Sequence, residues 1–140
     1  MNIINATKVR NEWSSISDSV IREKPAIIKK TRDYMFLSDI KTIEFMLKAY
    51  EFNADVFYED DGTVTMSLRE IDLIENDIDE ASALMKLSCA ILEYSEDYYN
   101  DFAYWSRGNR VSHLPYIFKS LLLKEPEKIG GIIQCHHGGI

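Results

Sequence analysis

The spacing of hydrophobic positions in the first third of the chain predicts a strand, a helix, two strands and a second helix. Two isoleucines open the first strand, and the next apolar residues recur at steps of three and four along a helix that Thr7 caps. Pro25 ends this helix, and Ser38 or Asp39 caps the second one. The predicted elements span residues 2–6, 7–23, 26–31, 34–37 and 40–50. The apolar stripe of the first helix comprises Val9, Trp13, Ile16 and Val20.

The hydrophobic period changes from 3.6 residues to two near Phe52, which divides the chain into predicted domains 1–51 and 52–140. Two alternating runs flank Asp61-Gly62, and Asp-Gly between strand-like runs is a strong hairpin signal. A third strand is predicted over residues 71–74. The predicted fold class is α+β, with a small β-α-β-β-α head followed by a three-stranded antiparallel sheet and C-terminal helices.

Helical patterns dominate the rest of the chain. Asp77-x-x-Glu80 resembles a capping box, so the longest helix is expected to begin there and to break within residues 105–110. Pro115 lies in the first turn of a further helix, and Pro126 starts a last short one. Residues 135–140 carry no periodic pattern and are expected to be irregular.

Net charge divides the chain into a basic and an acidic part. The 140 residues carry a formal charge of −7, yet residues 1–40 hold seven Lys and Arg against five Asp and Glu, a charge of +2. The remaining 100 residues therefore carry −9. This division favours a polyanionic partner for the head and a basic partner for the body, although an acidic surface also serves solubility.

Composition and hydropathy narrow the class of protein. A share of 46% hydrophobic residues is typical of a folded domain with a real core. Because no apolar run is long enough for a membrane span and residues 1–10 lack a signal-peptide pattern, a cytoplasmic location is expected. Cys89 and Cys135 form no CxxC motif and are expected as free thiols, with Cys89 in the helix core.

Basic residues gather at two points of the predicted head. Lys8 and Arg10 lie at the start of its first helix, and Lys29, Lys30 and Arg32 lie at the end of its second strand. If helix and strand pack together, both groups face the same way. Lys and Arg neutralise phosphates, and Arg also reaches base edges. Charge alone indicates DNA binding only weakly, because solvated faces are often basic.

The segments INATKVRNEWSSISDSV and KPAIIKKTRDYMFLSD resemble the N-terminal module of the Phd/YefM family of antitoxins, over roughly residues 1–50. The shared pattern is a strand, a helix that opens with a small residue, x and Arg, and a strand that ends in Thr-Arg. The resemblance implies that the module forms a homodimer through its sheet and binds operator DNA. Arg10 and Arg32 would be the main contacts. With Lys30 of the basic group, the predicted DNA site comprises Lys8, Arg10, Asn11, Lys30 and Arg32. At Asp33 the chain departs from the longer, glycine-containing turn of many members.

The second part resembles the small sheet-plus-helix domain of HicB-type antitoxins, a degenerate RNase H-like unit. The whole chain is also similar to longer antitoxins of toxin-antitoxin stability systems that share YNDF and NRxxHLPY, which are residues 99–102 and 109–116 in this sequence. These resemblances imply an antitoxin without enzymatic activity or cofactor. Its head would bind its own operator as a transcription repressor, and its acidic body would neutralise a basic toxin.

Two other functions fit parts of the sequence. A stand-alone DNA-binding regulator would need the head but no toxin. A metal-dependent nuclease would use acids of the second domain, because an RNase H-like fold invites such a site. The acids are Asp60, Asp61, Asp72, Glu75, Asp77 and Asp79. Four of them have a structural interpretation, since they lie in the predicted turn or at the predicted helix start.

The remaining alternatives concern residues near the end of the chain. Cys135, His136 and His137 would bind a metal only with a ligand from elsewhere, such as His113, and a mobile tail is the simpler interpretation. Arg107 and Arg110 either contact nucleic acid or pair with acids of the long helix.

Aromatic residues crowd the stretch 94–105, where they form either core or a partner surface. Those on the inward face of the long helix are expected in the core. Tyr99 and Tyr104 are the predicted toxin contacts, because tyrosine is enriched among residues that dominate binding energy.

Overall fold

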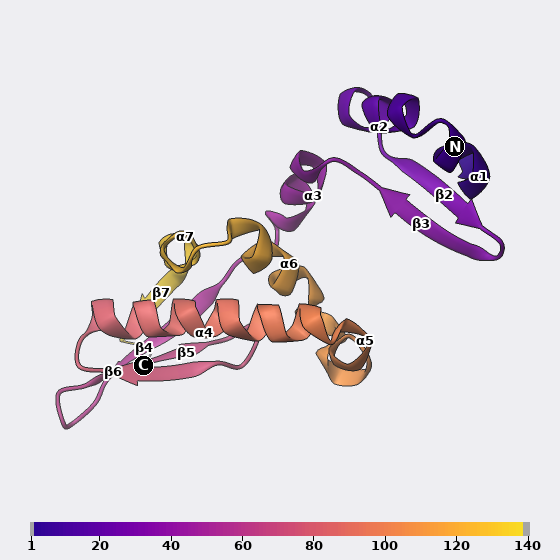
Figure 1. Cartoon of the computed structure of the whole chain (residues 1–140). Coiled ribbons are helices and arrows are strands. Elements are labelled where there is room, and N and C mark those ends of the chain that lie inside the picture. Colours follow the sequence, from indigo (N-terminus) through magenta and orange to yellow (C-terminus); the bar gives the residue numbers. More distant parts are fainter. Residues whose placement is uncertain (1, 139–140) are drawn as a thin grey trace. The chain divides into compact units, whose positions relative to one another are not determined.

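The computed structural model describes residues 2–138, and these fall into two compact units (Figure 1). Unit 1 is Met1–Met46 and unit 2 is Leu47–Ile140. Seven α-helices and two mixed sheets lie within the described residues, which confirms the predicted α+β class. Because each unit has its own sheet and its own helices, each is described by itself.

Unit 1 is built on a three-stranded sheet in the order β1-β2-β3. The middle strand β2 pairs in parallel with β1 and antiparallel with β3. The strands are β1 (Ile3–Asn5), β2 (Ala26–Lys30) and β3 (Asp33–Leu37), and the helices are α1 (Ala6–Asn11), α2 (Trp13–Arg22) and α3 (Ile40–Leu47). The parallel pair places the start of α1 beside the end of β2.

The single helix predicted over residues 7–23 is wrong. Glu12 has φ −122° and ψ 34°, outside helical geometry, and separates α1 from α2. Asn5, not Thr7, caps α1, because its side-chain oxygen accepts a hydrogen bond from the Thr7 N–H at 2.8 Å. The interruption also divides the predicted apolar stripe, in which Trp13 is 53% exposed.

The β2–β3 hairpin turns one residue earlier than predicted. Lys30 pairs with Asp33, so the two turn residues are Thr31 and Arg32. Thr31 has φ +58°, a left-handed conformation that a β-branched residue rarely adopts. After β3, Asp39 caps α3 as predicted, since its carboxylate accepts the Thr42 N–H at 3.1 Å.

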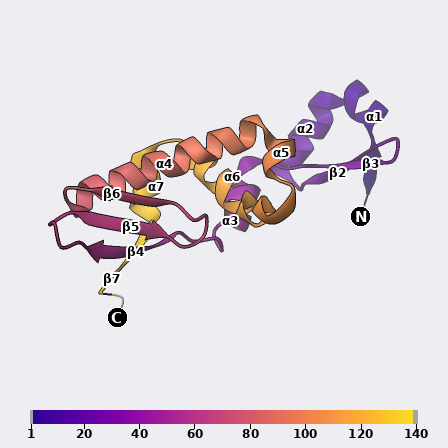
Figure 2. The same ribbon diagram turned by 90° about the horizontal axis from the view of Figure 1, so that it is seen from below.

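Unit 2 is built on a four-stranded sheet in the order β6-β5-β4-β7, and its long helix α4 packs against β5 and β6 (Figure 2). The strands are β4 (Asn53–Tyr58), β5 (Val64–Leu68), β6 (Ile74–Asp77) and β7 (Gln134–His137). The helices are α4 (Glu80–Asn100), α5 (Phe102–Trp105), the 3-10 helix η1 (Gly108–His113), α6 (Leu114–Leu123) and α7 (Pro126–Ile132). The helices predicted at Pro115 and Pro126 are confirmed.

The predicted hairpin around Asp61-Gly62 is confirmed, with Gly62 at φ +88°. The predicted three-stranded sheet is wrong, and so is the irregular tail for residues 135–137, whereas residues 139 and 140 lie outside the described residues. Strand β7 pairs in parallel with β4 and places Cys135 opposite Ala54. Its sequence Gln-Cys-His-His has no apolar alternation that would predict a strand. This edge strand is held instead by backbone hydrogen bonds and by the buried Ile133 before it.

The start of α4 also differs from the prediction. Asp79 caps it by accepting the Ser82 N–H at 2.7 Å, whereas Asp77 still belongs to β6 and pairs with Val64. The third strand therefore lies three residues later than the predicted 71–74. Cys89 is exposed rather than buried, because it lies on the side of α4 that faces away from the sheet.

The core of unit 2 lies between the sheet and α4. Its buried residues are Phe52, Ala54, Val56, Val64, Met66, Leu68, Ile71, Ala83, Leu87, Ile91, Ile129 and Ile133. Two serines on the buried face of α4 satisfy their hydroxyls within the helix: Ser88 donates to the Leu84 carbonyl and Ser95 to the Ile91 carbonyl, both at 2.7 Å. None of the helices in residues 2–138 is both long and apolar enough to span a membrane.

Candidate functional site

A depression at one end of unit 1 brings together residues from two distant parts of its sequence. It is lined by Asn5, Ala6, Thr7, Arg10, Lys29, Lys30 and Thr31. The parallel pairing of β1 with β2 places Asn5 opposite Lys29, and α1 begins directly after Asn5. Arg10 on α1 therefore lies near the two lysines at the end of β2. We call this group of residues the basic depression.

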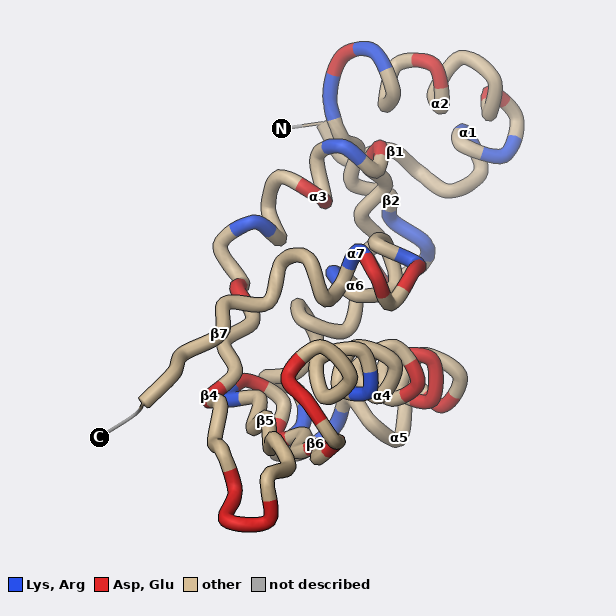
Figure 3. The backbone as a smooth tube through the Cα atoms, turned by 90° about the vertical axis from the view of Figure 1, so that its left-hand side faces the viewer, with Lys and Arg blue, Asp and Glu red and all other residues tan. Residues whose placement is uncertain are grey.

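The cations of the basic depression are available to a ligand. Arg10, Lys29 and Lys30 are exposed, and no Lys or Arg of unit 1 forms an ion pair within residues 2–46. The Lys29 ammonium lies 5.6 Å from the centre of the Tyr34 ring, its cross-strand neighbour, which orients it without neutralising it. Figure 3 shows the basic positions along α1 and β2.

The five predicted DNA contacts do not all line this depression. Arg10 and Lys30 do, and Arg32 follows Thr31 in the hairpin turn at its edge. Lys8 lines a different hollow together with Ile16, and Asn11 is the exposed last residue of α1. Lys29, which the sequence placed in the basic group but not among the predicted DNA contacts, also lines the depression, because the β1–β2 register sets it opposite Asn5.

The sheet of unit 1 is apolar on both faces. Ile28 pairs with Met35 on one face, and Ile27 pairs with Phe36 on the other. Ile28 is buried, but Met35 is 48% exposed and Phe36 is 54% exposed. Since a soluble monomer rarely leaves a contiguous apolar surface open, this sheet has the character of an interface.

The predicted toxin contacts lie on unit 2, near the end of α4. Tyr99 is 57% exposed and packs edge-on against Phe118, with their ring centres 6.3 Å apart. Tyr104 is 69% exposed and packs edge-on against Trp105 at 5.2 Å. Both side chains are thus supported by a second ring while they face solvent.

The motif NRxxHLPY attaches η1 to α4. Tyr94 on α4 hydrogen-bonds through its hydroxyl to His113 Nδ1 at 2.7 Å and accepts a bond from Arg110 Nη1 at 2.9 Å. Tyr98 donates its hydroxyl to the Arg110 carbonyl at 2.8 Å. Burial, and then the charge of Arg110, lower the pKa of His113. Neither Arg110 nor Arg107 forms an ion pair with an acid among the described residues.

The residues considered as metal ligands are held by other partners. His136 Nε2 bonds to Asn53 Oδ1 at 2.8 Å, and His137 Nε2 bonds to Glu80 Oε1 at 2.5 Å. Tyr58 donates its hydroxyl to the other oxygen of Glu80 at 2.8 Å. The bonds from His137 and then Tyr58 lower the pKa of Glu80. Within residues 2–138 no three His, Cys, Asp or Glu side chains gather where they could hold a metal ion.

The chain matches the model of one known protein family over most of its length. Residues 1–135 match the model of the PHD-like family, described as antitoxin of toxin-antitoxin, RelE / RelB, TA system. The chain belongs to this family of antitoxins. Membership of this family implies that the protein has a cognate toxin as its partner.

The antitoxin is also similar to a crystal structure from Syntrophomonas wolfei subsp. wolfei, described as an antitoxin part of a candidate toxin/antitoxin system. The two chains are 33% identical, and their TM-score is 0.90 over 98% of the antitoxin and 99% of that chain. No curated protein matches the antitoxin.

The predicted antitoxin function is thereby confirmed, and the family match covers more than the head. The match includes residues of unit 2 up to residue 135. A specific likeness of unit 2 to HicB stays a prediction, as do the individual DNA and toxin contacts.

Proposed function

We propose that this antitoxin acts as a homodimer that binds its own operator DNA through unit 1 and holds its toxin inactive against unit 2. The observation that carries the DNA-binding part is the basic depression. Arg10, Lys29 and Lys30 converge there from two elements, and none of them has a carboxylate partner among the described residues. Free cations in this arrangement neutralise phosphates and fix the position of a protein on a duplex.

Base recognition is assigned to the arginines, because a guanidinium can bond to both acceptors on the major-groove edge of guanine. Arg10 and Arg32 are the two exposed arginines at this end of unit 1, one on α1 and one in the hairpin turn. Lys8 and Asn11 lie outside the depression and serve as flanking backbone contacts.

The dimer is proposed on the two apolar faces of the unit 1 sheet. One protomer leaves Tyr34, Met35 and Phe36 on β3 between 48% and 58% exposed. A second copy that covers this surface would remove it from water, and the transfer of apolar surface from water is the main driving force of association. A two-fold dimer presents two basic depressions, which matches an operator with two inverted half-sites.

The toxin is assigned to unit 2 on the basis of charge. Leu47–Ile140 contains eight Lys and Arg against seventeen Asp and Glu, a net charge of −9, whereas Met1–Met46 carries eight against six, a net charge of +2. Complementary charge accelerates association and orients the partners. Tyr99 and Tyr104 are the proposed contacts within this acidic unit.

Fluorescence anisotropy with a labelled duplex from the antitoxin's own promoter tests the DNA part. The affinity is expected to fall steeply with salt, and the double variant Arg10→Ala, Arg32→Ala is expected to lose operator binding. The matched control is Arg22→Ala, Lys41→Ala, which also removes two positive charges from unit 1 but outside the depression. Binding that survives in the first variant, or is lost equally in the control, would reject the assigned site.

Coexpression with the protein encoded beside it tests the toxin part. The antitoxin is expected to copurify with that protein and to restore growth that the protein inhibits. Light scattering on the antitoxin alone measures the dimer. A monomer at micromolar concentration would contradict the proposed use of the sheet.

A further inference from the structure

Six aromatic rings form a continuous chain of contacts at the end of α4 in unit 2. In order they are Tyr99, Phe118, Phe102, Tyr98, Trp105 and Tyr104. The middle of this series of rings is fixed in the core, because Tyr98 is fully buried. Both ends emerge into solvent, with Tyr99 57% exposed and Tyr104 69% exposed. The two tyrosines are thus exposed rings on a rigid support.

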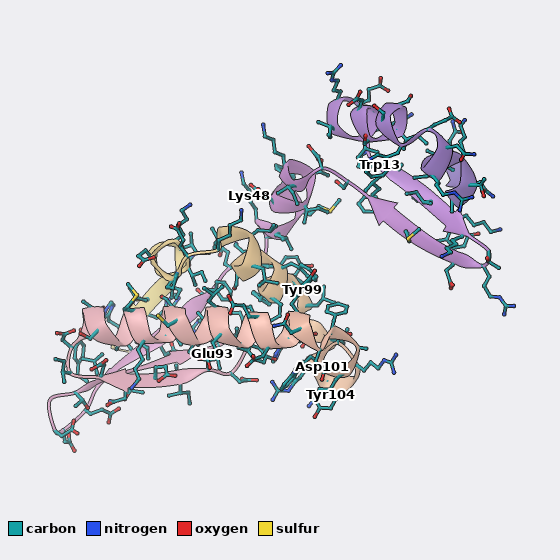
Figure 4. All side chains as sticks on the ribbon, in the orientation of Figure 1. Trp13, Lys48, Glu93, Tyr99, Asp101 and Tyr104 are labelled. Carbon is teal, nitrogen blue, oxygen red and sulfur yellow. The ribbon has the colours of Figure 1, made fainter. Side chains whose placement is uncertain are left out.

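The exposed side of α4 near these two tyrosines is acidic. Helical spacing places four acids there, the first two opposite the buried Leu87, Ile91 and Tyr98 and the last two on the flank of the helix. They are Glu93, Glu96, Asp97 and Asp101, the last being the C-cap residue of α4, and all four are exposed. Figure 4 shows Glu93, Tyr99, Asp101 and Tyr104 in the half of unit 2 where α4 meets α5.

These four acids lack the partners that some other acids of unit 2 have. Asp55 is paired with Arg69, and Glu75 with Lys86. No ion pair and no side-chain hydrogen bond involves any of the four within the described residues. Their charge is therefore not used to stabilise unit 2.

Their position on the helix is electrostatically unfavourable. The last carbonyls of a helix carry partial negative charge, which favours basic side chains in the last turn. Helix α4 has 21 residues and no basic residue in its last turn, and Asp97 and Asp101 stand there instead. A cation supplied by a partner would relieve this repulsion, so the helix end is better suited to a complex than to the free protein.

We propose that this acidic aromatic face, formed by Glu93, Asp97, Asp101 and Tyr104 with Glu96 and Tyr99 at its edge, receives an arginine- or lysine-rich segment of the toxin. The inference rests on the proposed function and names the surface that unit 2 uses. A guanidinium or ammonium group stacks on an exposed tyrosine ring and pairs with a neighbouring carboxylate. A second copy of this chain is excluded as the occupant, because two identical acidic faces repel each other.

The test uses the full-length antitoxin and the purified protein encoded beside it, with Kd measured by titration calorimetry at two salt concentrations. Tyr99→Ala, Tyr104→Ala removes the exposed rings and is expected to weaken binding about thirtyfold or more. The matched control is Phe57→Ala, Ile74→Ala, which removes two exposed apolar side chains of the sheet, 45% and 64% exposed. The control is expected to bind like the wild type.

A second pair of variants isolates the charge. Glu93→Gln, Asp97→Asn, Asp101→Asn is expected to slow association and to reduce its salt dependence. Its control removes three charges elsewhere in unit 2, by Glu59→Gln, Asp60→Asn, Glu127→Gln. Circular dichroism confirms that each variant is folded. Equal effects of the charge variant and its control would show general attraction only and would overturn the assigned face.

Three outcomes remain distinguishable. Wild-type affinity in both face variants overturns the inference but leaves the antitoxin function intact, because the toxin then binds another surface. Failure of the wild-type protein to bind the neighbouring protein rejects the proposed pairing itself. An oligomer of the antitoxin alone that the tyrosine variant dissociates would assign the face to self-association and overturn the inference.

Discussion

The guanidinium of Arg110 lies 5.1 Å from the centre of the Trp105 ring, so a side chain of η1 stacks on the aromatic residue that ends α5. The same guanidinium lies 5.7 Å from the centre of the Tyr94 ring and donates to its hydroxyl. Two rings and one hydrogen bond therefore hold Arg110 in place. Arg110 on η1 thereby contacts both α4, through Tyr94, and α5, through Trp105.

Arg110→Ala is expected to lower the free energy of unfolding by about 1–2 kcal/mol, because it removes cation–π contacts worth about 0.5–1 kcal/mol each and a hydrogen bond. Arg107→Ala is the control, because Arg107 is also exposed but has neither an ion pair nor a ring contact among the described residues. Urea unfolding measures both variants. A change of less than about 0.5 kcal/mol in Arg110→Ala would show that the stacking does not matter for stability.

Much of this fold follows from patterns that depend on near neighbours in the sequence. The Asp61-Gly62 hairpin, the helices that open at Pro115 and Pro126, and the Asp39 cap are all present, because each depends on a local signal. Strand β7 was missed because its pairing with β4 joins Ala54 to Cys135, far along the chain, through backbone groups that leave no side-chain pattern.

The residues of the candidate site were likewise only partly predictable from the sequence. The sequence identified Arg10 and Lys30 by charge, and the fold places them around one depression. Lys8 was grouped with Arg10, but the helix carries the two side chains to different hollows. Their two-residue spacing on a helix explains this, since such neighbours point about 200° apart.

Lys30→Ala is expected to weaken operator binding uniformly across DNA sequences and to reduce the salt dependence. Each phosphate contact contributes about 0.9 to the slope of log K against log salt concentration, so a dimer should lose nearly two. Anisotropy titrations at four salt concentrations measure the slope. Lys24→Ala, at the end of unit 1 away from the depression, should leave it unchanged. An unchanged slope in Lys30→Ala would remove this lysine from the DNA site.

Thr31→Gly is expected to stabilise unit 1 by about 0.5–1 kcal/mol, because Thr31 has φ +58° and glycine adopts this conformation without a steric cost. The same substitution at Thr65 in β5 should instead destabilise unit 2, since glycine weakens a strand and the hydrogen bond from Asn76 Nδ2 to Thr65 Oγ1 at 2.9 Å is lost. Thermal unfolding distinguishes the two. Destabilisation at both positions would mean that strain at the hairpin turn is negligible.

Leu87→Ala is expected to destabilise unit 2 by about 2–5 kcal/mol, because Leu87 is fully buried between α4 and the sheet and its truncation leaves a cavity. Met85, two residues earlier on the same helix, is 42% exposed, so Met85→Ala should cost much less. Denaturant unfolding measures both. If Leu87→Ala leaves toxin binding intact while unit 2 is folded, the core and the binding surface are separate.

Glu80 links β4, α4 and β7, because it accepts bonds from Tyr58 and from His137. These bonds lower its pKa from 4.5 in the folded protein. A carboxylate with a depressed folded-state pKa contributes stability that is present above pH 4.5 and is lost as pH falls through the folded-state value.

Glu80→Gln should therefore destabilise the protein at pH 7, and the difference in stability from the wild type should shrink below pH 4.5. Urea unfolding between pH 3 and pH 7 measures it, with Glu127→Gln as the exposed control. A difference that stays constant over this range would mean that Glu80 acts through packing and not through its charge.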